Sequence, residues 1–150
     1  MAKAFVGDLA FLSNMYPCRM HLSVNGTAYT FTSAEAAFQA GKCVRDSDVA
    51  LLAASKSGYD AKKLGRRVKM RPRWDDERVA WMKKVIRAKF NSSPLLMQKL
   101  VETAPMELVE ENDWHDTFWG VSGGVGENRL GKILMEVRGQ EIVKRQENMD

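Results

Sequence analysis

The sequence has few cysteines, no long apolar run and no spaced set of metal-binding side chains. Its only two cysteines among 150 residues, Cys18 and Cys43, do not form a CxxC or Cys/His spacing, which excludes a disulfide framework and a zinc site of the usual kind. We therefore expect free thiols, a reducing compartment and no bound metal. No segment approaches the roughly 20 apolar residues that cross a membrane, so no membrane partner is expected.

Targeting and nucleotide-loop patterns are also missing. The first residues, MAKAFVGDLAF, carry Gly7 and Asp8 inside their apolar run, unlike a signal peptide, so a cytoplasmic location is predicted. The glycine-rich segment near position 126 has Ile133 where a phosphate loop needs a magnesium-binding hydroxyl, and Arg129 where a dinucleotide loop needs glycine. We expect no cofactor.

The composition is that of an ordinary globular protein. Hydrophobic residues make up 45% and charged residues 28%, and a chain of this length can bury a core of its own. No internal repeat or proline-rich linker divides it. The prediction is one compact α+β domain over residues 1–150, mainly helical, with a small β-sheet that includes an N-terminal hairpin.

Positive charge is concentrated in one short segment. The net charge is +4, and seven basic residues fall between positions 62 and 73: Lys62, Lys63, Arg66, Arg67, Lys69, Arg71 and Arg73. Such a cluster favours an anionic partner, and a solvated basic face has comparable weight. Few aromatic residues are interleaved before Trp74, which argues against a platform for single-stranded nucleic acid.

Local patterns predict the order of elements. Two alternating runs around Asn25-Gly26 indicate a β-hairpin within β-structure over residues 5–31. Apolar spacing and capping residues predict helices over 33–43, from 46 or 47 to Ser57-Gly58, over 75–90 and over 94–103. A last helix is predicted after the glycine-rich loop, and its inward face carries Ile133, Leu134, Val137 and Ile142. The basic segment would form a short helix or loop up to Pro72, and residues 106–110 could form a strand.

The helix predicted over 33–43 carries a line of polar side chains. Glu35, Gln39 and Lys42 are separated by four and three residues, which returns the first and last to within about 20° of one face at 100° per residue. A carboxylate, an amide and an amine would thus share one face, which is an arrangement suited to catalysis. The alternative is structural and weighs more on sequence alone: Thr32 and Glu35 have the spacing of a capping box, and Lys42 would be a solvated residue at the helix end.

A second polar and aromatic cluster lies before the glycine-rich loop. It consists of Asp113 and Trp114, followed by Trp119 and Gly120. A tryptophan can stack on a flat base while a neighbouring carboxylate accepts a hydrogen bond. The alternative interpretation, in which both tryptophans belong to the core and Asp113 is a turn residue, has similar weight.

These segments together resemble the NADAR (YbiA-like) family of N-glycosidases. No one motif is diagnostic, but their order along residues 5–138 is. The matching residues are Phe11-Leu12-Ser13-Asn14, Tyr16-Pro17, Tyr29, Ser33 to Ala40, Lys42, Gly65-Arg66, Arg73-Trp74-Asp75, Lys89-Phe90, Leu95, Leu100, Trp119-Gly120, Gly126, Asn128, Leu130-Gly131, Leu134-Met135 and Arg138. Ala36 replaces the family's usual histidine and Met15 its usual aromatic residue, so a histidine-dependent step at position 36 is absent.

The resemblance implies a YbiA-like fold and cleavage of a base from ribose. The implied substrates are riboflavin-pathway intermediates bearing ribose phosphate, or ADP-ribose attached to guanine, the latter free or within modified nucleic acid. Cleavage requires stabilisation of positive charge at the anomeric carbon, which Glu35 or Asp113 could supply, or attack by Lys42 as an unprotonated amine.

The same resemblance implies a set of substrate-binding residues. Arginines would bind phosphate because their geometry is bidentate. The set is Asn14, Tyr16, Gln39, Arg66, Arg67, Arg73, Trp74, Trp119, Gly120 and Asn128. A non-catalytic module that binds ADP-ribose or nucleic acid through the same basic residues and tryptophans is the alternative function.

Overall fold

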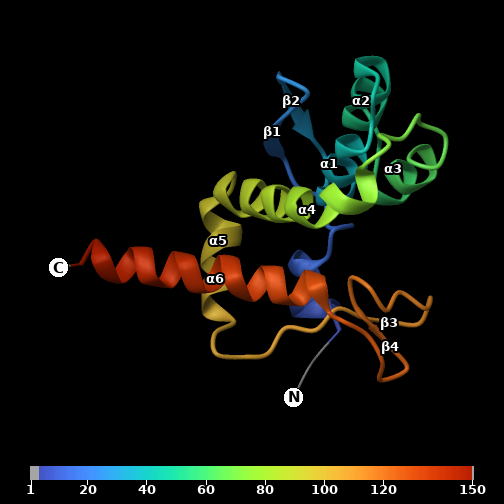
Figure 1. Cartoon of the computed structure of the whole chain (residues 1–150). Coiled ribbons are helices and arrows are strands. Elements are labelled where there is room, and N and C mark those ends of the chain that lie inside the picture. The colour runs from blue at the N-terminus through green and yellow to red at the C-terminus, as the bar shows by residue number, and fades with distance from the viewer. Residues whose placement is uncertain (1–3, 150) are drawn as a thin grey trace. The chain divides into compact units, whose positions relative to one another are not determined.

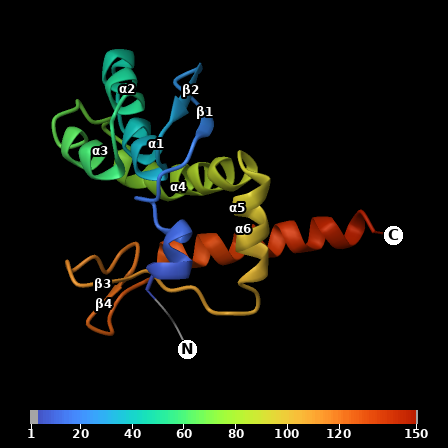
Figure 2. The ribbon, with the colours of Figure 1, turned by 180° about the vertical axis from the view of Figure 1, so that it is seen from behind.

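The computed structural model describes residues 4–149 (Figures 1 and 2). Its internal contacts divide the chain into two compact units. One unit comprises Asn14–Ser93, and the other comprises the N-terminal residues up to Ser13 together with the chain from Pro94 onward. The fold is mainly helical with small β-sheets, one of which is an N-terminal hairpin, as the sequence predicts.

The predicted hairpin is confirmed in the unit of residues 14–93. Strands β1 (Met20–Val24) and β2 (Thr27–Phe31) pair antiparallel, with Val24 opposite Thr27. Between them Asn25 and Gly26 have φ values of 51° and 83°, the left-handed conformation that a two-residue primed turn requires. The prediction of β-structure from residue 5 is wrong for the preceding segment, because Gly7–Leu12 forms a 3-10 helix, η1. That segment lacks the alternation that a half-buried strand needs.

Helix α1 (Ala34–Gly41) confirms the helix predicted over 33–43, but not its predicted cap. Ser33 is the N-cap, and its hydroxyl accepts the Ala36 amide at 3.1 Å. The Thr32 hydroxyl donates instead to the Ser55 carbonyl. The capping-box interpretation of Thr32 and Glu35 is therefore wrong, since the residue three positions after the cap is Ala36.

Two short helices follow, the first in place of the helix predicted from 46 or 47, and the second within the segment predicted as a short helix or loop. Helix α2 (Asp46–Ala53) ends before Ser57, whose hydroxyl accepts the Asp60 amide and caps α3 (Gly58–Leu64). Ser57-Gly58 therefore begins a helix, contrary to the prediction that a helix stops there. Much of the basic segment lies in the loop after α3, and its first two lysines lie on α3 itself.

Helix α4 (Trp74–Asn91) matches the predicted helix over 75–90. It buries Met82, Val85, Ile86 and Phe90, the apolar face that the three- and four-residue spacing indicates. Helix α1 contacts α2, α3, α4 and both strands of the hairpin, and all eight of its residues are buried. Polar side chains on α1 are therefore enclosed on several sides.

The other unit holds the C-terminal elements. Helix α5 (Pro94–Glu102) packs on α6 (Arg129–Glu147), which buries Ile133, Leu134 and Val137 as predicted and leaves Ile142 half-buried. The strand predicted over 106–110 is wrong: β3 covers only Glu111–Asn112 and pairs in parallel with β4 (Val121–Ser122). The Arg138 guanidinium donates to the Thr103 hydroxyl and the Met106 carbonyl, which ties the chain before β3 to α6. Across residues 4–149, the helices are all too short or too polar to cross a membrane.

Candidate functional site

Glu35 and Gln39 form a hydrogen-bonded pair on one face of α1. The Gln39 amide nitrogen donates to a Glu35 carboxylate oxygen at 2.9 Å, and each residue is only 9% exposed. Because the donor is a neutral amide, it holds the carboxylate in place without cancelling a negative charge. The structure thus joins two of the residues that sequence spacing predicted to share a face.

The approach of Asn14 fixes the first turn of α1. Its backbone carbonyl accepts the Glu35 amide at 2.9 Å, and its side-chain nitrogen lies 3.5 Å from the Met82 sulfur. Gly58, the first residue of α3, faces the same place: a Cβ there would lie 2.7 Å from the Met15 sulfur and 3.4 Å from the Glu35 Cβ. Met15 and α3 therefore pack beside Glu35, and the absence of a side chain at Gly58 makes that packing possible.

Gly65 leaves room for Gln39. A Cβ on Gly65 would collide with the Gln39 side-chain oxygen, and the φ of Gly65 is −59°, which any residue adopts. The need for glycine here is thus one of space. The same Gln39 oxygen is buried and has no hydrogen-bond partner, an arrangement that costs roughly 1–3 kcal/mol. Of the two polar atoms of this amide, the nitrogen makes a hydrogen bond and the oxygen does not.

Lys42 lies at the end of α1, close to the charges of Glu35 and Arg66. It is half-buried, and partial burial is the main cause that lowers the pKa of its amine, with Arg66 acting in the same direction. Two neighbouring groups, Cys43 and the Glu35 carboxylate, oppose this shift. A lowered pKa raises the fraction of unprotonated amine at neutral pH, and half-burial leaves the group reachable. A carboxylate and a reachable amine thus lie along one face.

The arginines predicted to bind phosphate occupy two different environments. Arg66 and Arg67 are exposed in the loop after α3. Arg73 precedes α4 and pairs with Asp76 at 3.7 Å, both side chains being largely exposed. An exposed pair of this kind contributes little to stability. Of these three arginines, Arg66 is the one whose charge helps to lower the pKa of Lys42.

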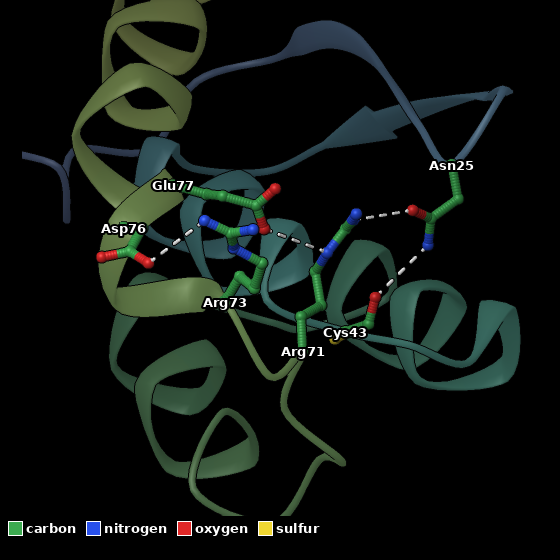
Figure 3. Close-up of polar contacts among 6 residues, drawn as sticks. All are labelled: Asn25, Cys43, Arg71, Arg73, Asp76 and Glu77. Atoms are coloured by element: carbon green, nitrogen blue, oxygen red, sulfur yellow. Dashed lines mark hydrogen bonds and ion pairs between the residues drawn. The ribbon is translucent and has the colours of Figure 1, made fainter.

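Trp74 forms part of the wall of a pocket beside α1. It packs on Phe38 with ring centroids 5.3 Å apart and lines a pocket with Gly41, Arg71, Glu77 and Trp81. Figure 3 shows Arg71 between Asn25 and Glu77, and Arg73 turned toward Asp76. Trp74 therefore contacts α1 through Phe38, three residues after Glu35, and its role in substrate binding stays a prediction.

The remaining predicted residues belong to the unit that contains α5 and α6. Asn128 is buried, and its side chain accepts the Glu110 amide and donates to the Leu108 carbonyl. A Cβ on Gly120 would collide with Glu110. Trp119 is half-buried and Asp113 and Trp114 are exposed, so these two exposed residues are not part of the core. Asn128 and Gly120 therefore help to pack the loop before α6.

The carboxylate that organises this loop is Asp116, which sequence reasoning did not single out. One of its oxygens accepts the amides of Phe118 and Trp119 at 3.1 and 2.9 Å. Asn112 donates to the Asp116 carbonyl and accepts its amide. An aspartate that accepts amides two and three residues ahead is the usual sign of an Asx turn. Such a turn holds Trp119 at a defined position.

Sequence reasoning also missed a buried lysine. Lys89 is 1% exposed within the apolar face of α4, and its amine lies 5.8 Å from the centre of the Tyr16 ring and 5.3 Å from that of Phe90. Burial lowers the pKa of this amine to about 8, although the charge of Cys18 opposes the shift. The signal was present, because residue 89 follows the three- and four-residue spacing of Met82, Val85 and Ile86.

The buried amine of Lys89 predicts how stability changes with pH. The pKa of Lys89 is about 8 in the folded chain and 10.5 in the unfolded chain. Between these two pH values the unfolded chain holds the proton and the folded chain does not. The free energy of unfolding therefore rises with pH over this range, by up to about 3 kcal/mol. Burial also raises the pKa of Cys18, and that of Cys43 to about 11, which has the opposite effect above pH 9. We expect urea unfolding at pH 8, 9 and 10 to show this rise for the parent relative to Lys89→Met, which keeps both thiols. Parallel pH profiles would contradict the assignment.

Within residues 4–149, no group of three or more histidine, cysteine, aspartate or glutamate side chains gathers in a way that could hold a metal ion. The described residues of the candidate site offer a carboxylate, amides, an amine and guanidinium groups. Such groups can stabilise positive charge, move protons and bind phosphate.

Comparison with known proteins agrees with this architecture. The family model described as the NADAR domain matches residues 5–141. The chain is 36% identical over 119 residues to N-glycosidase YbiA of Escherichia coli K12, which covers 77% of this chain and 74% of that protein. The NMR structure of E. coli YbiA superimposes with a TM-score of 0.83 at 30% identity, covering 97% of this chain and 88% of the other.

Longer proteins contain a similar region. The riboflavin biosynthesis protein VVA0006 of Vibrio vulnificus is 38% identical over 133 residues, which cover 85% of this chain and 34% of that protein. The chloroplastic riboflavin biosynthesis protein PYRR of Zea mays is 35% identical over 130 residues, 20% of its length. The chain therefore spans about a third or less of these two relatives.

Proposed function

Because this chain belongs to the NADAR domain family, we propose that it is an N-glycosidase that hydrolyses the bond between a base and a ribose phosphate or ADP-ribose. Its relatives include an N-glycosidase and riboflavin biosynthesis proteins. The observation that carries the proposal is the buried Glu35 carboxylate held by the neutral Gln39 amide beside the half-buried Lys42. We propose early riboflavin-pathway intermediates and ADP-ribosylated guanine as the two candidate substrates.

The proposed chemistry places negative charge where positive charge grows. As the bond to the base breaks, the anomeric carbon becomes cationic, and the Glu35 carboxylate stabilises it or assists proton transfer. A carboxylate fixed before the reaction acts more strongly than one that must reorient. Asp113, exposed in the other unit, is the alternative source of negative charge, with Trp119 as a surface for the base.

A direct assay tests the function. Purified protein is incubated separately with a ribosylaminopyrimidine phosphate and with ADP-ribosylated guanosine, and liquid chromatography measures the released base. We expect release from one of them at a rate that depends on Glu35. Tight binding with no release from either substrate would instead indicate a non-catalytic ADP-ribose or nucleic-acid binding module, and neither binding nor release would refute both functions.

We further propose that residues 1–150 act as one functional domain in a reducing, cytoplasmic compartment. The family match over residues 5–141 extends across both structural units, which supports the single domain. Cys18 and Cys43 are both free thiols, which supports the reducing compartment.

Arg66 and Arg67 should contribute to binding through the phosphate of the substrate. Replacing both with alanine should raise KM for a phosphorylated substrate at least ~10-fold, because each charge-assisted bond contributes roughly 1.5–3 kcal/mol. Both side chains are exposed, so the melting temperature should stay near that of the parent. Lys144→Ala, an exposed basic residue on α6, is the control. An unchanged KM in the folded double variant would make these arginines a solvated face.

Gln39 should act by positioning Glu35 rather than by touching the substrate. Its nitrogen is used by Glu35 and its oxygen is enclosed against Gly65. Gly65→Ala should push the amide aside and lower kcat at least ~10-fold with little change in KM, because a displaced carboxylate loses its preorganised geometry. The measurement is steady-state kinetics together with the melting temperature.

Two further variants make this prediction specific. Gly139→Ala is the control, because nothing lies within 4 Å of a Cβ at Gly139. Combining Gly65→Ala with Gln39→Ala removes the collision and should restore the melting temperature but not kcat. If the double variant recovers parental kcat, the Gln39 amide has no positioning role.

A further inference from the structure

A pocket lies beside α1 where Gly41 faces α4. It has a volume of about 520 Å³ and is bounded by Asn25 at the hairpin turn, Gly41 of α1, Arg71 and the α4 side chains Trp74, Glu77 and Trp81. At 100° per residue, Gly41 lies about 120° from Glu35 around α1. A volume of this size is within the range of small-molecule sites.

The walls of this pocket are built around one close contact. A Cβ on Gly41 would collide with the Trp81 indole, whose Nε1 donates to the Ala37 carbonyl at 3.0 Å. Trp81 is half-buried at the pocket wall. Glycine at position 41 thus lets an indole lie flat against the helix backbone, and the hydrogen bond holds it there.

The charges that line the pocket balance in number, and two of them form an ion pair. Arg71 contacts Glu77 at 3.6 Å and donates to the Asn25 side-chain oxygen at 3.0 Å, while the Asn25 nitrogen donates to the Cys43 carbonyl at 3.3 Å (Figure 3). The remaining lining charges are Lys84 and Asp76, one of each sign. A pocket whose lining charges balance gives no net attraction to an anion such as a nucleotide phosphate.

We propose that this pocket binds a neutral planar heterocycle with an amino group, namely an aminated nucleobase or its nucleoside. The indole of Trp81 supplies a surface for stacking. The Glu77 carboxylate accepts hydrogen bonds from an exocyclic amino group, and the Arg71 guanidinium donates to a ring nitrogen or carbonyl. Glu35, Gln39 and Lys42 do not line this pocket, and the proposal does not depend on the proposed reaction.

Titration followed by NMR of the indole N–H signals tests the site. The full chain, with the Trp74 and Trp81 signals assigned from Trp74→Phe and Trp81→Phe, is titrated with adenosine, uridine and adenosine monophosphate. We expect saturable shifts of the Trp81 signal with adenosine, at least ~5-fold weaker binding of uridine, which lacks an amino group, and no gain from the phosphate. Free adenine binding as well as adenosine would identify the base alone as the ligand, and a requirement for adenosine would identify the nucleoside.

Matched carboxylate variants separate this pocket from others. Glu77→Gln should weaken adenosine binding at least ~5-fold. Asp75→Asn, an exposed carboxylate in the same turn of α4, and Glu35→Gln should both bind as the parent does. The proposal is overturned if the Trp81 signal does not saturate, if uridine binds equally well, or if Asp75→Asn weakens binding as much as Glu77→Gln. Loss of binding in Glu35→Gln would place the ligand at the reaction site instead.

Discussion

Replacing Glu35 with glutamine should lower kcat at least ~100-fold, a loss of about 2.7 kcal/mol of transition-state stabilisation, with little change in melting temperature. Glutamine has the same shape and can still accept the hydrogen bond that the Gln39 nitrogen donates at 2.9 Å. It lacks the negative charge that stabilises a cationic sugar. The measurement is kcat on the ribosylated substrate that the chromatographic assay identifies, together with thermal unfolding.

The structure sharpens this experiment because the cap of α1 is Ser33. With Ser33 accepting the Ala36 amide, the capping box no longer accounts for a carboxylate at position 35. Glu102→Gln, an exposed glutamate on α5, is the control and should leave kcat unchanged. Near-parental kcat in a folded Glu35→Gln protein would remove Glu35 from the mechanism and transfer the assignment to Asp113.

Replacing Lys42 with arginine should likewise lower kcat at least ~100-fold, because arginine keeps the charge but cannot form a Schiff base. In the proposed route the unprotonated amine attacks the anomeric carbon, the bond to the base breaks, and the base leaves with a proton. The sugar ring then opens to an imine, which water hydrolyses to free the sugar and the lysine. Borohydride added during turnover should reduce the imine and attach the sugar mass to Lys42.

The environment of Lys42 also predicts a pH effect. Burial lowers its pKa below 10.5. The rate should therefore rise with pH as the amine loses its proton, and reach its plateau at a pH lower than an ordinary lysine would give. Mass spectrometry of digested protein locates the adduct. Lys63→Arg, an exposed lysine on α3, is the control. Absence of an adduct together with an active Lys42→Arg variant would leave Lys42 an electrostatic or structural residue.

Burial also separates the two lysines whose pKa is lowered. Burial lowers the pKa of Lys89 to about 8, yet its side chain is 1% exposed. A nucleophile must reach the anomeric carbon. The half-buried Lys42 meets that requirement, so we assign the nucleophilic role to Lys42 and expect no sugar adduct on Lys89.

Elements whose signal is local were predictable from the sequence. Asn25-Gly26 at the hairpin tip and the apolar spacing of Met82, Ile86 and Phe90 on α4 each arise within a few residues. The line from Glu35 to Gln39 was also predictable, because helical geometry alone places residues four apart together. The NADAR resemblance, carried by the order of motifs, was confirmed by the family match.

Features that depend on distant residues were not predictable. Thr32 and Ser33 are both residue types that cap helices. Ser33 is the cap in the structure, while the Thr32 hydroxyl donates to the Ser55 carbonyl, 23 residues away. The end of α2 was misplaced because a Ser-Gly pair can end one helix or begin the next, and Ser57 caps α3. Extended chain at Leu108 and Val109 is buried without pairing as a strand, which alternation cannot reveal.

By itself the sequence determined the family, the main helices, the hairpin and the shared face of Glu35 and Gln39, because periodicity, turn chemistry and motif order are properties of neighbouring residues. Only the tertiary structure decided what surrounds them. It enclosed the Gln39 oxygen against Gly65, buried Lys89 close to Tyr16, and brought Trp74 and Trp81 together in the pocket beside Gly41. Those outcomes depend on which helices pack against α1, and packing is decided by contacts between segments far apart in the chain.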